Sequence, residues 1–181
     1  MLDATKLLAI FHPLLAEERL NELGPGTPNL AVKSLLQEVE RELPKIAKNR
    51  AFASACLAGL WLYHDFSDES HAISQDLDTV EGSYWHGMLH RREPDYGNAK
   101  YWFRRVPRHP IFAELWQDAK TLTHEAGSDI QLGAKTWDAS AFVDLCESAA
   151  RGPDELTLLC RRIQKREWEL LFHFCHVNAF F

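Results

Sequence analysis

The segment HGMLHRRE, residues 86–93, carries the residues best suited to chemistry. His86 and His90 are four residues apart, so on a helix their imidazoles lie on one face, about one turn from each other. Glu93 returns to nearly the same angle if the helix continues to the residue before Pro94. Two imidazoles and a carboxylate suit one divalent transition metal with open positions for water. We therefore predict a metal site here; hydrogen-bonded histidines in a polar core are the alternative.

A second cluster, YHDFSDESH at residues 63–71, directly follows an apolar run. His64, Glu69 and His71 are suitable as further metal ligands or as a general acid and base. The alternative is that the acidic residues cap the next helix and the histidines are structural. The predicted metal ligands are thus His86, His90, His64, His71, Glu69 and Glu93, and the predicted catalytic residues are His71, His86 and His90.

Charge is separated within the same part of the chain. Residues 65–81 hold six acidic residues and no Lys or Arg, whereas residues 91–109 hold six basic residues against two acidic ones. A basic island in a chain of net charge −6 predicts an anion pocket with aromatic walls. Salt bridges between the two stretches, forming a structural polar seam, are the alternative. The candidate substrate-binding residues are Arg91, Arg92, Lys100, Arg104, Arg105, Tyr96 and Trp102.

These residues support three hypotheses about function. The first is an enzyme that acts on a small anionic or phosphorylated substrate, with one divalent transition metal as cofactor, which would lower the pKa of a bound water. The second is a non-catalytic module that binds a small anion in the same pocket. The third is a structural or interaction protein in which the polar seam only stabilises the fold.

The elements that position these residues are predicted to be helices, because apolar residues recur at three- and four-residue intervals. The run at residues 51–63 is apolar on all sides, which is typical of a helix buried in a bundle. Thr79 and Asp138 are helix-start signals. We expect an all-α, single-domain bundle of about seven to nine helices, with an N-terminal helical pair at 1–48, a functional segment at 61–116 and C-terminal helices at 138–178. Individual helices are expected to begin after Asn29 and to cover 80–92, 95–106, 110–124, 138–150 and 154–178.

Length and composition fit one globular domain: 181 residues, 46% hydrophobic and 25% charged, which excludes disordered and collagen-like classes. The negative net charge argues against a nucleic-acid partner. No apolar run reaches the ~20 residues that a membrane helix needs. Four cysteines without a CxxC pair fit a reducing compartment, so we expect a cytoplasmic protein. The apolar C-terminus, FHFCHVNAFF, is a candidate homodimer surface.

The segment SYWHGMLHRREPDYGNAKYWFRRV resembles the signature stretch of an uncharacterised protein family of bacteria and fungi. The similarity extends loosely from His64 to Pro110 and to the stretch CRRIQKREWELLF near the C-terminus. It points to the same residues as the chemistry above, and it implies no particular reaction.

Overall fold

The computed structural model describes residues 11–130, 132–133 and 135–181. Within these ranges the chain is all-α and single-domain, as predicted, with no β-strand. The first predicted helix lies partly outside the described residues; its described part is helical at 11–15. The further elements are the 3-10 helix η1 (Leu30–Val32) and the α-helices α2 (Lys33–Ile46), α3 (Arg50–Tyr63), α4 (Ser67–Asp76), α5 (Val80–Arg92), α6 (Tyr96–Phe103), α7 (Phe112–Glu125), α8 (Ala139–Ala149) and α9 (Asp154–Phe180).

Local side-chain caps explain where several helices begin. The Thr79 side chain accepts a hydrogen bond from the Gly82 N–H at the start of α5, and Asp138 accepts two at the start of α8. Asn29 does not cap an α-helix as predicted, because the chain first forms η1 and α2 begins only at Lys33. Helix α6 ends at Phe103, before the predicted residue 106, and the backbone then turns into the loop that leads to α7.

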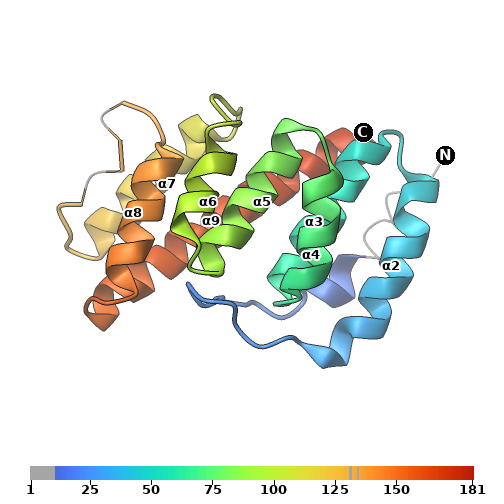
Figure 1. Cartoon of the computed structure of the whole chain (residues 1–181), viewed down its shortest axis with the longest axis horizontal. Helices are drawn as coiled ribbons and strands as arrows, with labels where there is room; N and C mark the ends of the chain where they lie inside the picture. Colours follow the sequence, from blue (N-terminus) through green and yellow to red (C-terminus); the bar gives the residue numbers. More distant parts are fainter. Residues whose placement is uncertain (1–10, 131, 134) are drawn as a thin grey trace.

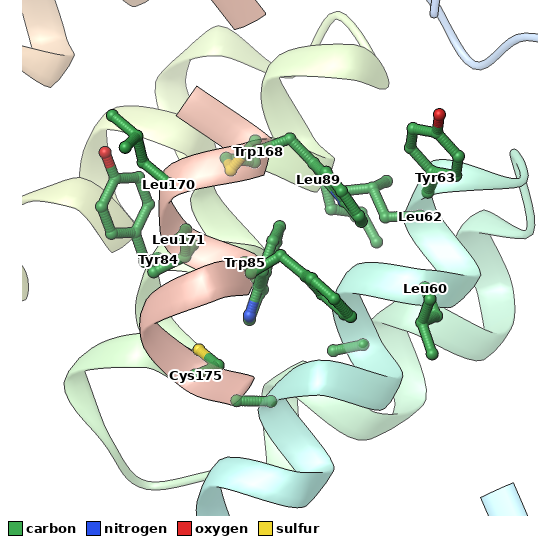
Figure 2. Close-up of a cluster of buried hydrophobic side chains, with 14 of the residues drawn as sticks. Leu60, Leu62, Tyr63, Tyr84, Trp85, Leu89, Trp168, Leu170, Leu171 and Cys175 are labelled. Atoms are coloured by element: carbon green, nitrogen blue, oxygen red, sulfur yellow. The ribbon is translucent and has the colours of Figure 1, made fainter. Parts of the chain in front are cut away.

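Helix α3 forms the centre of the core, and ten of its fourteen residues are buried. It packs against α2, α4, α5 and α9, and the long helix α9 runs behind α6, α5 and α3 (Figure 1). Trp85 of α5 lies between α9 and α3 (Figure 2), close to Gly59. A Cβ atom at Gly59 would lie 2.7 Å from the Trp85 ring, so glycine is needed for this approach.

The apolar C-terminus belongs largely to this core. Cys175, Ala179 and Phe180 are buried, whereas Val177 is 39% and Phe181 71% exposed. The homodimer surface therefore stays a prediction with little apolar area behind it. In the described part of the chain, no helix is both long and apolar enough to cross a membrane.

Candidate metal centre

Three histidines from two helices converge beside α6. His71 of α4 meets His86 and His90 of α5, and one nitrogen from each ring lies within 4.8 Å of the other two. Ring centroids are 4.6 Å apart for His71–His86 and for His86–His90, and 5.5 Å apart for His71–His90. His86 and His90 are buried, whereas His71 is half-buried. We call this group the histidine triad.

Small residues allow α4 to pack closely against α3 and α5, which brings the histidines of the triad together. Ser70 and Ser74 are the buried residues of α4, and the Ser70 hydroxyl donates to the Ala58 carbonyl of α3 at 2.9 Å. A Cβ atom at Gly82 would lie 2.1 Å from the Leu77 carbonyl oxygen, so this glycine lets α5 start directly against the end of α4. α5 contacts α4 on one side and α6 on the other, in the middle of the molecule (Figure 1).

His86 is held as a neutral imidazole. Its Nδ1 lies 3.2 Å from the Ser74 hydroxyl, and the Trp102 ring of α6 packs over it at 4.1 Å between centroids. Burial, reinforced by the like charges that His90 and His71 would carry, lowers the pKa of His86 to about 3. A neutral ring is the form that binds metals, so this site favours a metal ion over a proton.

The two ring nitrogens of His90 have different surroundings. Its Nε2 lies 3.1 Å from the side-chain amide of Asn98. Its Nδ1 is buried and makes no regular hydrogen bond, although Glu93 Oε2 lies 3.0 Å away beside it. Burial lowers the pKa of His90, against the opposing effect of the nearby Glu93 carboxylate.

The triad fits a divalent transition ion in donor type, and its donor atoms lie near the spacing that such an ion needs. Donors that each bind a tetrahedral zinc at ~2.1 Å lie roughly 3.4 Å apart, somewhat closer than the limit of 4.8 Å seen here. The buried and unpartnered Nδ1 of His90 is a further feature that a metal would satisfy. Three protein ligands would leave at least one coordination position for water or substrate.

Three of the six predicted ligands fall outside the triad: Glu93 lies beside His90, and the other two lie apart from the triad. His64 is buried at the end of α3, where its Nε2–H donates to the Leu14 carbonyl at 2.9 Å. Glu69, on the first turn of α4, forms an ion pair with Lys33 at 3.1 Å. Both residues are occupied in tying neighbouring segments together, and neither belongs to the group of converging donors.

Arg91 and Arg92 also depart from their predicted role, because their side chains point into the protein. Arg91 is fully buried and donates from Nη2 to Glu167 Oε2 at 2.6 Å, while the Tyr84 hydroxyl donates to the other Glu167 oxygen at 3.1 Å. Arg92 is buried against Asp65 and donates to the Leu62 carbonyl at 2.8 Å. These guanidinium groups neutralise internal carboxylates, so a substrate in solvent has no access to them.

The remaining predicted anion-binding residues lie nearer the surface. Lys100 pairs with Asp144 of α8, and Arg105 pairs at 3.3 Å with Asp78 on the acidic stretch. The Arg104 guanidinium lies over the Tyr101 ring, and that of Arg105 lies 5.0 Å from the Trp102 ring centre. Tyr96 is half-buried at the start of α6. The polar-seam interpretation is correct for two contacts, Arg92–Asp65 and Arg105–Asp78, which join the acidic and basic stretches.

Two residues beside the triad were missed by sequence reasoning, Ser74 and Asn98. Ser74 lies three residues after His71, so helical spacing places it on the same face of α4 and could have indicated it. Asn98 lies on the next helix after the Pro94 break, and no local pattern connects it with His90.

The described part of the chain is thus an all-α bundle in which the half-buried His71 of α4 meets two buried histidines of α5. The sequence matches no family model, and searches of curated proteins and of solved structures found no match. The resemblance to an uncharacterised family therefore stays a prediction.

Proposed function

We propose that the protein is a metal-dependent enzyme that acts on a small anionic or phosphorylated substrate. One divalent transition metal would be held by His71, His86 and His90. The observation that carries this proposal is the convergence of three imidazole donors within 4.8 Å, two of them buried and with lowered pKa values. Buried neutral imidazoles that face one another gain little from each other, whereas they all gain from a shared cation.

The substrate side of the proposal rests on α6. The Trp102 ring packs on His86, and the guanidinium of the exposed Arg105 lies 5.0 Å from the Trp102 ring centre, so Trp102 contacts both the triad and a cation. The neighbouring Arg104 is also exposed. We propose that these two arginines, rather than the buried Arg91 and Arg92, attract the negative charge of the substrate.

The metal would lower the pKa of a water molecule in its coordination sphere. The chain supplies the rest: α4 and α5 fix the imidazoles, Ser74 orients His86, and Trp102 limits access of solvent. The four cysteines are free and buried, which supports our proposal of a reducing, cytoplasmic location.

Elemental analysis of the purified, untagged protein by plasma mass spectrometry tests the proposal. We expect about one equivalent of transition metal in the wild type, retained after dialysis, and its loss in His86→Ala/His90→Ala. The matched control is His124→Ala/His173→Ala, which removes two exposed histidines from α7 and α9 and should keep the metal. Circular dichroism of each variant separates metal loss from unfolding.

A wild-type protein without metal, even after supplementation with zinc, manganese and iron, would contradict the proposal. The exposed Arg104 and Arg105 would then favour the second candidate, a non-catalytic module for small anions. That candidate predicts that inorganic phosphate stabilises the metal-free protein and that added salt weakens the effect.

A further inference from the structure

Either ring nitrogen of His90 could bind a metal, and the choice between them determines which neighbouring side chain lies beside the ion. Nε2 already has a partner, the Asn98 side chain at 3.1 Å. Nδ1 is buried and has no regular hydrogen bond. In metal sites, a histidine usually binds the ion with one nitrogen and donates from the other to a supporting oxygen. The unpartnered Nδ1 is therefore the better ligand atom, with Asn98 as the support of Nε2.

Asn98 is suited to this support because its amide accepts or donates according to its orientation. In the structure the amide nitrogen Nδ2 faces His90 Nε2, and turning the amide by 180° exchanges the oxygen and nitrogen at nearly unchanged shape. The Nε2–H of His90 then donates to Asn98 Oδ1, and Nδ1 keeps its lone pair for the metal. The backbone of Asn98 is fixed by its N–H bond to the Asp95 side chain at the start of α6.

Glu93 stands beside this nitrogen, at the edge of the triad. Its Oε2 lies 3.0 Å from His90 Nδ1, yet Glu93 does not belong to the group of donors that lie within 4.8 Å of one another. It follows α5 as the cap residue, and its side chain is 33% exposed, against 8% for His90. The carboxylate is thus more exposed to solvent than the imidazole beside it.

We propose that Glu93 is the general base of the metal centre, placed at the open coordination position rather than in the ligand set. This inference rests on the proposed function. In hydrolysis of a phosphate ester, Glu93 Oε2 takes one proton from the attacking water as the water oxygen bonds to phosphorus. The bond from phosphorus to the leaving oxygen breaks, and Glu93 returns the proton to that oxygen. No group is oxidised or reduced, and the exposed side of the carboxylate allows exchange with solvent.

Cobalt(II) is a suitable probe because its visible absorption reports the ligand set, and azide reports the open position. We compare the wild type, Glu93→Gln and the matched control Glu69→Gln, whose carboxylate pairs with Lys33 outside the triad. We expect Glu93→Gln to keep its Co²⁺ affinity within about threefold and its spectrum unchanged. Azide should bind this variant roughly five- to tenfold more tightly, because a neighbouring negative charge has been removed. Glu69→Gln should resemble the wild type in all three measurements.

Hydrolysis of p-nitrophenyl phosphate by the cobalt-loaded protein gives a second readout, in which Glu93→Gln should lose about 10²-fold or more of kcat. An azide affinity within twofold of the wild type would overturn the inference. So would a large loss of Co²⁺ affinity in Glu93→Gln, which would make Glu93 a ligand. A wild-type protein that binds no Co²⁺ would instead overturn the proposed function, and this inference with it.

Discussion

Helix α5 carries two pairs of buried polar residues in very different surroundings. Arg91 and Arg92 reach carboxylates, Glu167 and Asp65, so that the charge of each guanidinium is neutralised inside the protein. His86 and His90, which precede the arginines on the same helix, face each other and His71 instead, and the carboxylate beside His90, that of Glu93, is partly exposed.

This difference between the paired arginines and the histidines gives a criterion for distinguishing structural from functional polar residues in one buried helix. A buried charge with its counter-charge in place is complete, and removing either partner damages the fold. A group of neutral imidazoles with converging lone pairs is incomplete, and such a group is stabilised by binding something from outside. The predictions below treat the arginine pairs and the histidine triad as opposite cases.

The largest expected effect is on the arginine pair. Glu167→Ala leaves the fully buried Arg91 without its counter-charge, so the free energy of unfolding should fall by about 3–5 kcal/mol in urea titrations. Asp144→Ala, which removes the partner of the more exposed Lys100, is the control and should cost less than about 1 kcal/mol. Equal, small losses in both variants would show that Arg91 is not structural and would return it to the anion-pocket hypothesis.

The triad should show its effect through added metal. Zinc at about one hundred times its Kd should raise the free energy of unfolding of the wild type by roughly 2.7 kcal/mol. His86→Ala/His90→Ala should lose this increment, since two of its three donors are missing. Glu167→Ala, although less stable, should keep it. A zinc increment that survives in the histidine variant would place the metal elsewhere.

The metal-free triad should also make stability depend on pH. Burial holds the pKa of His86 at about 3 in the folded protein, against ~6.5 in the unfolded chain. Between these values the unfolded chain binds more protons, so stability falls as the pH falls, by up to about 1.4 kcal/mol per pH unit from this residue. Urea titrations between about pH 6 and pH 4 should therefore show a shallower slope for His86→Gln. An identical slope would mean that His86 is not a neutral buried imidazole.

The smallest effect on stability is expected at the surface. Arg105→Gln removes a cation whose one ion pair among the described residues is with the almost fully exposed Asp78, so the free energy of unfolding should change by less than about 0.5 kcal/mol. Inorganic phosphate should nevertheless raise the melting temperature of the metal-loaded variant by less than that of the wild type. The reason is that Arg105 lies against Trp102, which in turn packs on His86 of the triad. An unchanged phosphate shift would remove Arg105 from the substrate site.

Much of the fold could be predicted from sequence because its signals are local. Thr79 and Asp138 cap the helices that they were expected to start, and α5 matches its predicted range of 80–92. The His86–His90 pair was equally local, because helical geometry brings residues four apart together. Glu167 recurs with the apolar residues of α9 at helical spacing, but that position alone does not identify Arg91 as its partner.

The rest of the site depends on which way the side chains of α5 point and on how α6 packs against it, and the sequence specifies neither. Every residue of α5 from Gly82 to Arg92 is buried, so no amphipathic pattern shows which face looks towards α4, α6 or α9. Arg91 and Arg92 could therefore not be separated from surface arginines by their spacing. The contact of Asn98 with His90 depends on how α6 folds back after Pro94, a tertiary feature without a local signal.

The central claim is that one metal ion binds between His71, His86 and His90. Crystals grown with zinc, with diffraction data collected on both sides of the zinc absorption edge, test it most directly. The account predicts a single anomalous peak about 2.1 Å from one ring nitrogen of each histidine, with Glu93 beside it. A zinc-saturated crystal with no peak between these three rings, or with its peak at another site, would contradict it.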